Sequence, residues 1–280
     1  MPLEDDFCDI LKKSRMGQGL SLDEVARATG LSKADLAAWE RGDPVRKRSD
    51  VHVLADALGL RAEPLARIAI DHWEPLPRRW PAGVEAVRGS VGGYGVWGYV
   101  VFDEGEAVVI DTAYHAPAMV DLLGLRGLRL VGICLTHGHA DHAEGIDQLL
   151  NHREVPVYLG REDRDLLGWR PRSDLLVAPA DGQVIRVGRL TIACLVTPGH
   201  TLGGICYRLD DRDDPVCFVG DTLFAGSIGR SNPLTLYTTH LKSVRERVLT
   251  LAPNCRLLPG HGPATTVAEE RAHNPFATVE

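Results

Sequence analysis

Three histidines and one aspartate stand within six positions of this chain, directly after an apolar run. The apolar run covers residues 130–135, and residues 137–142 then read His-Gly-His-Ala-Asp-His. An apolar run that ends in a glycine-containing polar turn is typical of a buried strand that brings its last residues to a sheet edge. Imidazole and carboxylate groups together suit zinc, with iron and manganese as alternatives. We therefore interpret this segment as part of a metal site rather than as a polar surface turn.

Three further apolar runs end in a residue type that can bind a metal ion. His200 follows the run 190–195, Asp221 follows the run 216–220, and His261 follows the run that begins at Cys255. One such junction is weak support for a metal site, because short motif matches often arise by chance. Four junctions of the same kind predict that the ends of four strands meet around one site.

The segment 137–142 resembles the H-x-H-x-D-H signature of the metallo-β-lactamase superfamily, and the resemblance extends over about residues 80 to 277. Within this superfamily the chain is most similar to the short glyoxalase II-like hydrolases. That similarity rests on Gly220–Arg230, on the ending Pro259–Pro263 and on the segment Glu270–Phe276. The resemblance implies that the larger part of the chain is a metal-dependent hydrolase.

The same resemblance implies a site for two divalent metal ions, with zinc as the expected metal and iron or manganese as alternatives. Each ion would be held by its own set of side chains, and one carboxylate would bridge the pair. The sets are His137, His139 and His200 for one ion, Asp141, His142 and His261 for the other, and Asp221 as the bridge. Metal coordination lowers the pKa of water towards ~7. The expected reaction is hydrolysis through a metal-bridging hydroxide, with Asp141 and Asp221 as catalytic carboxylates.

The expected substrate is a thioester of the hydroxyacylglutathione type. A thiolate is a good leaving group with a pKa of about 8.5, so its release needs little help from a protonated side chain. Arg230 is a candidate substrate contact by its place in the family loop, with a solvated or structural arginine as the alternative. Asp111 is a candidate for orienting a ligand histidine or for capping the next turn. Full-length glyoxalase II enzymes carry glutathione-binding helices where this chain has a short tail after His261, which leaves the thiol carrier open.

Two other functions are alternatives. A persulfide dioxygenase has the same fold and a single iron, which here would be held by His137, His200 and Asp221. Those enzymes usually place an acidic residue after the final histidine, and Gly262-Pro263 at this place favours the two-metal hydrolase. The second alternative is a regulator that senses metal or binds DNA through the N-terminal region.

The N-terminal region, residues 1–74, has the sequence pattern of a small helical domain. Ser21–Glu24 and Ser32–Asp35 are helix-start signatures, and Gly30 between them predicts a tight turn. The region resembles a Cro/C1-type helix-turn-helix domain. Residues 1–75 carry eleven Lys and Arg against fourteen Asp and Glu, a net charge of −3, which disfavours contact with phosphates. DNA is therefore a weakly supported partner, and a docking or dimerisation role, which would give a homodimer, is the alternative.

The expected class is α/β, with the helix-turn-helix domain over residues 1–74, a Pro-rich linker over 75–82 and the hydrolase domain over 83–280. The resemblance implies an αββα sandwich for the larger domain, in which two mixed sheets lie face to face between helices, with the metals at the sheet edges. We expect strands near 83–89, 97–103, 106–111, 130–135, 155–159, 183–187, 190–196, 204–209, 215–220 and 255–258. We expect helices near 115–123, 141–151, 161–168, 236–250 and 265–273.

The composition of the chain limits the cellular location and the binding partners that we expect. The net charge of −7 gives no attraction to membranes or polyanions. The first residues lack the apolar core of a signal peptide, and no apolar run is long enough to span a bilayer. The six cysteines form no C-x-x-C pair, and we expect them to be buried free thiols in a reducing compartment. The expectation is a cytoplasmic protein with a small-molecule substrate and no membrane partner.

Overall fold

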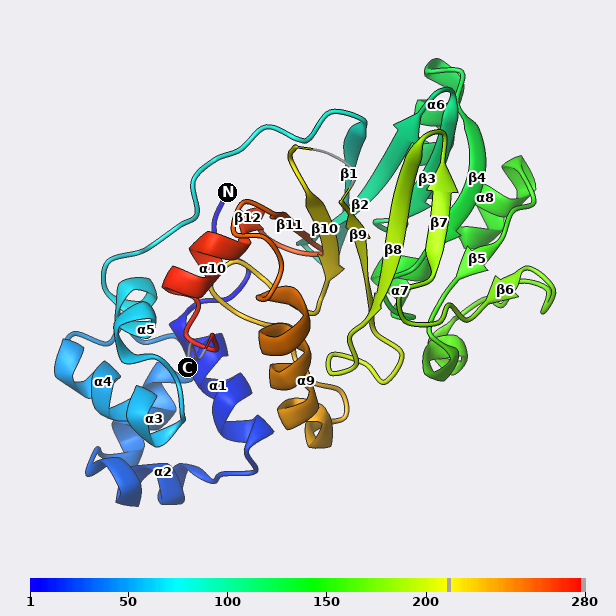
Figure 1. Cartoon of the computed structure of the whole chain (residues 1–280). Helices are drawn as coiled ribbons and strands as arrows, with labels where there is room; N and C mark the ends of the chain where they lie inside the picture. Colours follow the sequence, from blue (N-terminus) through cyan, green and yellow to red (C-terminus); the bar gives the residue numbers. More distant parts are fainter. Residues whose placement is uncertain (211–212, 278–280) are drawn as a thin grey trace.

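The computed structural model of the chain describes residues 1–210 and 213–277. Two six-stranded sheets lie face to face, and the helices of the N-terminal region pack beside the second sheet (Figure 1). The expected domain 83–280 includes residues 211–212 and 278–280, which lie outside the described residues. Within the described ranges, no helix combines the length and the apolar composition needed to cross a bilayer.

Local hydrogen bonds set the ends of the N-terminal helices. The Ser21 hydroxyl accepts a hydrogen bond from the Glu24 N–H, and the Glu24 carboxylate accepts one from the Ser21 N–H. Ser32 accepts from the Asp35 N–H at 3.0 Å, and Gly30 ends a helix at a φ of 71°, which glycine adopts without a Cβ clash. Both predicted helix starts and the turn between them are confirmed. The helices are α1 (Phe7–Gly17), α2 (Leu22–Thr29), α3 (Lys33–Trp39), α4 (Arg48–Ala57) and α5 (Ala62–Ala69).

The first sheet has the order β1-β2-β3-β4-β5-β6. The pairs from β1 to β3 are antiparallel, and the pairs from β3 to β6 are parallel, so the sheet is mixed as expected. The parallel connection between β3 and β4 passes through helix α6 (Ala116–Leu125). The strands are β1 (Val84–Val91), β2 (Tyr94–Asp103), β3 (Glu106–Ile110), β4 (Arg129–Cys134), β5 (Val157–Tyr158) and β6 (Leu176–Val177).

The second sheet has the order β12-β11-β10-β9-β8-β7. Its strands β10 and β11 are parallel, and the other neighbours are antiparallel. All residues of β10 are buried, because the first sheet covers one face of this strand and helices cover the other. The strands are β7 (Val184–Val187), β8 (Leu190–Val196), β9 (Ile205–Leu209), β10 (Val216–Gly220), β11 (Arg256–Pro259) and β12 (Thr265–Thr266).

The αββα sandwich is confirmed by where alternate side chains of one strand are buried. Tyr99 and Val101 of β2 belong to the cluster between the two sheets, while Val96 and Val100 belong to the cluster under the outer helices. This separation follows from the two-residue repeat of a strand. Helices α6 and α8 (Ile146–His152) cover the first sheet. Helices α9 (Tyr237–Ser243) and α10 (Val267–His273) lie beside the second (Figure 1).

Two strand predictions were wrong in their bounds because the turn that joins them is tighter than expected. Strands β1 and β2 continue to Val91 and Tyr94 and pair there, so only Gly92 and Gly93 form the loop. Both glycines have positive φ, which is the conformation of a two-residue hairpin turn. The long β1–β2 hairpin matters for function because its tip reaches the candidate metal centre described below.

The helix predictions differ from the structure where tertiary contacts interrupt them. The expected helix 141–151 is split into α7 (Ala140–Ala143) and α8, because Gly145 has a φ of 88°. The expected helix 161–168 is a 3-10 helix over Arg161–Leu166, and the helix near 236–250 continues beyond α9 as a π-helix over Val244–Val248. Residues 265–266 pair with β11 as strand β12 before α10 begins, so the expected helix 265–273 starts two residues later.

The N-terminal helices share one hydrophobic cluster with the second sheet and its helices. Lys13 of α1 pairs with Asp5 and donates to the carbonyl of Ile228 at 2.9 Å, and Ser227 donates to Asp5. The Arg61 N–H, just before α5, donates to the Pro275 carbonyl at 2.9 Å. The helical region is therefore docked on the sandwich through buried contacts. The boundaries at residues 74–75 and 82–83 stay predictions.

We expect Glu270 to make the stability of the protein depend on pH. Burial raises the pKa of this carboxyl group to about 7 from 4.5. Its Oε2 accepts from Gly226 N and Asn274 Nδ2, so a proton on Oε1 can be donated to Thr265 Oγ1, 2.7 Å away. Because the folded pKa is the higher one, this group stabilises the fold fully below pH 4.5, and the contribution is lost as the pH rises to about 7.

The variant Glu270→Gln tests this expectation, because its amide can make the same hydrogen bonds without titrating. From pH 4.5 to 7 the free energy of unfolding of Glu270→Gln should rise, relative to the parent protein, by roughly 3 kcal/mol. Urea denaturation at several pH values measures this difference, with the exposed Glu162→Gln as the control. A difference that stays constant with pH would contradict the prediction.

Candidate metal centre

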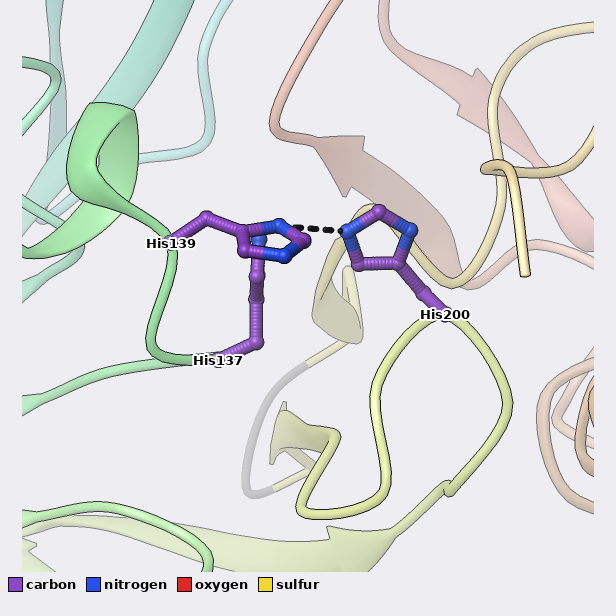
Figure 2. Close-up of side chains that lie close together, drawn as sticks. All are labelled: His137, His139 and His200. Carbon is purple, nitrogen blue, oxygen red and sulfur yellow. Dashed lines mark hydrogen bonds between the residues drawn. The ribbon is translucent and has the colours of Figure 1, made fainter. Parts of the chain in front are cut away.

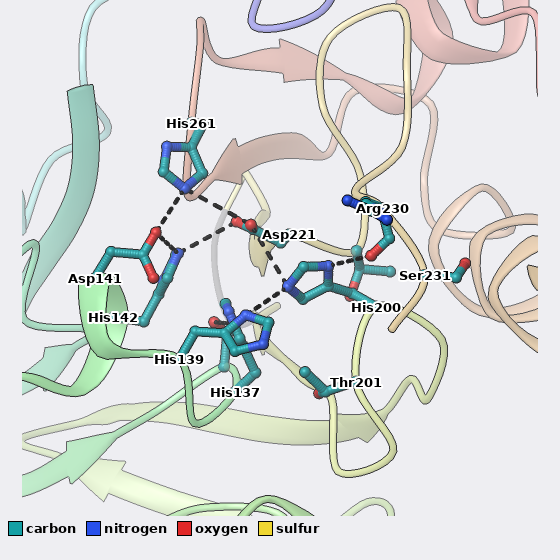
Figure 3. Close-up of polar contacts among 12 residues, drawn as sticks. His137, His139, Asp141, His142, His200, Thr201, Asp221, Arg230, Ser231 and His261 are labelled. Atoms are coloured by element: carbon teal, nitrogen blue, oxygen red, sulfur yellow. Dashed lines mark hydrogen bonds and ion pairs between the residues drawn. The ribbon is translucent and has the colours of Figure 1, made fainter. Parts of the chain in front are cut away.

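The ends of four strands from both sheets bring all seven sequence-predicted ligands together (Figure 3). The loop after β4 and helix α7 come from the first sheet, and the loops after β8, β10 and β11 come from the second. Strands β10 and β11 are parallel, with Gly220 opposite Pro259, so their following loops leave the sheet at the same edge. The residues are His137, His139, Asp141, His142, His200, Asp221 and His261. Their ligand roles stay a prediction that this convergence supports.

The first set consists of His137, His139 and His200. Figure 2 shows the first two rings on one loop, with His200 facing His139 from the opposite side. The Nδ1 atom of His139 and the Nε2 atom of His200 lie 3.0 Å apart. Ligand atoms about 2.1 Å from a tetrahedral zinc ion are about 3.4 Å from one another, so the rings have nearly the spacing that such an ion requires.

The second set surrounds Asp221 (Figure 3). Asp221 Oδ1 lies 3.3 Å from His142 Nε2, and Asp221 Oδ2 lies 3.6 Å from His261 Nε2 and 3.7 Å from His200 Nε2. Asp141 Oδ2 lies 3.2 Å from His261 Nε2. The Asp221 carboxylate therefore stands between His200 of the first set and the two histidines of the second. This is the position that a bridging ligand requires.

Hydrogen bonds on the far side of the rings fix which nitrogen faces the centre. Nδ1 of His200 donates to the Arg230 carbonyl at 2.7 Å, and Nδ1 of His261 donates to the Gly95 carbonyl at 2.8 Å. Nδ1 of His142 donates to Asp111 Oδ2 at 2.8 Å. Since Nδ1 of each of these three rings donates a hydrogen bond, Nε2 is the ring atom left to bind a metal ion. The sequence did not indicate the backbone acceptors.

The donor atoms that face the centre fit a cation. His137 Nε2, His142 Nε2 and Asp221 Oδ1 are buried and make no hydrogen bond in the described part of the chain, although the last two lie 3.3 Å apart as an ion pair. Buried polar atoms normally have a partner, because an unpaired one costs about 1–3 kcal/mol. Nitrogen and carboxylate oxygen are the ligands that zinc accepts in catalytic sites. The residues present therefore fit the divalent metals predicted from the sequence.

The electrostatics of the centre also require positive charge. Burial raises the pKa of Asp221, but His261 and His142 outweigh burial and hold this pKa well below its usual range. Burial lowers the pKa of His261, but Asp221 and Asp141 outweigh it and raise the pKa to about 9. For His200 burial prevails and lowers the pKa to about 4. The carboxylates are thus ionised and draw protons onto neighbouring imidazoles, a role that metal ions would take over.

Asp111 lies directly behind the second set. It is buried with a φ of 53°, and its carboxylate accepts from the Thr136 N–H and hydroxyl as well as from His142. A non-glycine residue in this backbone region is strained and marks a functional constraint. The contact with His142 is the one expected of a residue that orients a ligand, and the accompanying bonds to Thr136 hold the start of the 137–142 loop.

Asp163 is a site residue that the sequence did not indicate. Its buried carboxylate accepts from the Gly138 N–H at 3.1 Å, from the Thr201 hydroxyl at 2.7 Å and from the Gly203 N–H at 2.7 Å. It therefore ties the loop that carries His137 and His139 to the loop that carries His200. No local signal marks Asp163, because it lies in a charged segment that resembles an exposed helix.

The mouth of the centre includes the N-terminal segment, which the sequence also did not indicate. A cavity of about 350 Å³ exposes Asp141 and His261 and is lined as well by Glu4, Tyr94 and Tyr114. Tyr94 lies at the tip of the β1–β2 hairpin. Glu4 packs on Gly262, where an added Cβ would lie 3.0 Å from the Glu4 nitrogen. The residues before α1 thus form one wall of the opening to the site.

Two glycines let the backbone approach the ligands. A Cβ on Gly260 would lie 2.4 Å from Asp221 Oδ1, and a Cβ on Gly229 would lie 1.9 Å from the Asp221 carbonyl oxygen. Neither contact could be relieved without moving Asp221. Arg230 follows Gly229 with an exposed side chain, and its carbonyl holds His200. Its predicted role as a substrate contact stays a prediction.

Family models match both regions of the chain. The model described as the metallo-beta-lactamase superfamily matches residues 91–261, and a helix-turn-helix domain model matches residues 7–68. Hydroxyacylglutathione hydrolase GloC of Haemophilus influenzae is 30% identical over 190 residues, which cover 62% of this chain and 88% of that protein.

Solved structures are similar over the same part. BLEG-1, a B3 metallo-beta-lactamase, gives a TM-score of 0.60 at 29% identity and covers 70% of this chain and 100% of its own. TTHA1623 in a di-iron-bound form gives a TM-score of 0.58 at 28% identity and covers 68% of this chain and 99% of its own. These similarities agree with the sandwich fold and with the expected metal dependence.

The variant Asp111→Asn should bind metal more weakly, by about 10- to 100-fold, because the amide cannot accept all three hydrogen bonds and His142 loses its orienting partner. Competition with a chromophoric chelator measures this affinity directly. Asp121→Asn on α6 removes an exposed carboxylate and is the matched control. Equal affinities for both variants would show that Asp111 has no effect on the metal.

Proposed function

Because this chain belongs to the metallo-β-lactamase superfamily, we propose that it cleaves a thioester at a centre of two divalent metal ions. The observation that carries the proposal is the position of Asp221 between two groups of ligand atoms. A single-metal site would leave one of these groups of buried ligand atoms without a cation. Zinc fits the donor set best, with iron and manganese as alternatives.

In the proposed reaction the metal ions would activate water and the substrate carbonyl, and the chain would hold the ligand side chains in position. Bound divalent cations lower the pKa of water and polarise a carbonyl oxygen. Asp221 and Asp141 keep the two sets of histidines at a fixed spacing, and the carbonyls of Arg230 and Gly95 hold the rings of His200 and His261 in place. This pre-organisation means that little reorganisation is needed during the reaction. The mouth beside Glu4, Tyr94 and Tyr114 admits the acyl group.

A thioester is the proposed substrate for two reasons. Its thiolate leaves without a protonated side chain, since the pKa of a thiol is about 8.5. The similarity to hydroxyacylglutathione hydrolase GloC over 62% of the chain supports the same class. The persulfide dioxygenase alternative is less favoured, because those enzymes usually place an acidic residue after the final histidine and this chain has Gly262 there. Gly262 has a φ of 72°, and a side chain there would press on Glu4.

Metal analysis and one substitution test the proposal. The purified protein should contain close to two metal ions per chain, and it should hydrolyse a thioester in preference to a lactone. Asp221→Ala should reduce turnover by a factor on the order of 10³ or more, because several kcal/mol of metal-based stabilisation depend on the bridge. Asp121→Ala serves as the control, and circular dichroism checks that both variants fold.

Two results would reject this function. A single iron per chain together with oxygen consumption on glutathione persulfide would establish the dioxygenase. Full thioesterase activity in Asp221→Ala would show that this carboxylate is not the bridge.

A regulatory role is a second candidate, because the helix-turn-helix model matches residues 7–68. Helix α3 lies away from the sandwich, so its surface is open to a partner (Figure 1). Its first turn, however, offers Lys33 beside Asp35, and Lys33 pairs with Asp23 at 2.8 Å. Such a surface provides few contacts for base edges or phosphates. We therefore assign the helical region primarily to docking on the hydrolase.

We expect the full-length protein to bind DNA weakly, with a dissociation constant of about 10⁻⁶ M or larger at physiological salt, because the region has a net charge of −3. Fluorescence anisotropy with a pool of random duplexes, followed by selection for a preferred duplex, measures this affinity. A selected duplex bound at nanomolar concentration, with strong salt dependence, would instead establish a DNA-binding regulator.

A further inference from the structure

A cavity of about 190 Å³ lies where helix α1 meets the segment 228–237. It is separate from the mouth of the metal centre, because the two cavities share no lining residue. One wall comes from the helix-turn-helix region and the other from the sandwich. The side chains that matter here are Lys12, Lys13 and Met16 on α1, and Arg230, Leu234 and Tyr237 on the opposite wall.

The cavity has more positive than negative charge. Lys13 is already paired with Asp5. Lys12 and Arg230, in contrast, have no ion-pair partner among residues 1–210 and 213–277. The carboxylate that lines the cavity belongs to Asp9, and it accepts hydrogen bonds from the Asp6 N–H and the Cys8 thiol. Two free cations from distant parts of the sequence therefore line one small cavity.

This arrangement favours an anion over a cation. Arg230 is exposed and Lys12 is half-buried, so a ligand can reach both cations beside the apolar parts of Met16, Leu234 and Tyr237. The chain as a whole is acidic, so its composition does not account for a local excess of cations. Carboxylate and phosphate groups accept short, charge-assisted hydrogen bonds from lysine and arginine.

The cavity is also connected to the metal centre through one stretch of backbone. Gly229 lines the cavity, and a Cβ there would lie 3.1 Å from His200 Nδ1. The carbonyl of Arg230 accepts the hydrogen bond from the same nitrogen at 2.7 Å. An anion held by Arg230 would therefore lie one backbone segment away from a proposed metal ligand.

We propose that this cavity binds the carboxylate or phosphate group of a small molecule, with Lys12 and Arg230 as its charged contacts. Lys13 stays paired with Asp5 and fixes α1 against Ile228. The anion has two candidate sources, the carrier end of the thioester substrate and a free small anion. The first source rests on the proposed hydrolase function, whereas anion binding as such does not.

Calorimetric titration of the full-length, metal-loaded protein with inorganic phosphate tests binding. Lys12→Gln should weaken the affinity about tenfold through the lost charged hydrogen bond, and Lys12→Arg should restore most of it. Lys47→Gln removes an exposed cation of the same region and should have no effect. Phosphate bound at the metals would not respond to Lys12→Gln, so equal affinity in this variant and the parent protein would overturn the proposal.

Kinetics with two thioesters identify the source of the anion. One has a thiol carrier that bears a carboxylate, and the other has a neutral carrier of the same length. If the carrier occupies the cavity, Lys12→Gln should lower the ratio of kcat/KM for the charged over the neutral substrate about tenfold, mainly through KM. If phosphate affinity falls while this ratio is unchanged, the ligand is a free anion.

The phosphate titration and the thioester kinetics distinguish failure of the anion site from failure of the proposed function. No thioester hydrolysis by the parent protein would reject the proposed function, and the phosphate titration would still decide the cavity. Equal phosphate affinity in Lys12→Gln and the parent protein would reject the anion site while leaving the hydrolase function untouched.

Discussion

The rest of this structure depends on one constraint: many lone pairs that can bind a metal ion are crowded together in the candidate metal centre. Five imidazoles and two carboxylates meet at one point, and three of their buried donor atoms have no hydrogen-bond partner in the described chain. Metal ions between them would offset both the repulsion and the lost hydration, in place of the protons that the carboxylates otherwise draw onto the imidazoles. The residues behind the rings, Asp111 above all, then have one task. They hold the rings of His142, His200 and His261 with Nε2 toward the centre.

The loop from Asp221 to Arg230 joins this centre to the helical region. One end carries the proposed bridging carboxylate, and the other end holds His200 through a carbonyl. Between them, Ser227 and Ile228 make the buried bonds to Asp5 and Lys13. This loop positions proposed ligands and also contacts α1. A movement at one end of the loop would therefore affect the other end. The helix-turn-helix region is therefore part of the structural support of the hydrolase, which agrees with its acidic charge.

The features that could be predicted depend on short stretches of chain. Four strand ends were recognisable because β4, β8, β10 and β11 are apolar runs followed by polar turns, and burial selects such runs directly. The caps at Ser21 and Ser32 were predictable for the same reason, since their hydrogen bonds reach only three residues along the chain. The split of the expected helix 141–151 could not be predicted from a short stretch of sequence, because it depends on Gly145 packing against Ala116.

The identities and the order of the proposed ligands could thus be predicted from the linear chain, since residue type dictates which atoms can bind a metal and strand ends dictate where they emerge. Folding alone settled which nitrogen of His200 and of His261 faces inward, because the acceptors at Arg230 and Gly95 are backbone atoms without any sequence signal. Folding also brought Glu4 to the mouth and Asp163 between two ligand loops. Their contacts are with residues 25 or more positions away along the chain, and no local pattern encodes such contacts.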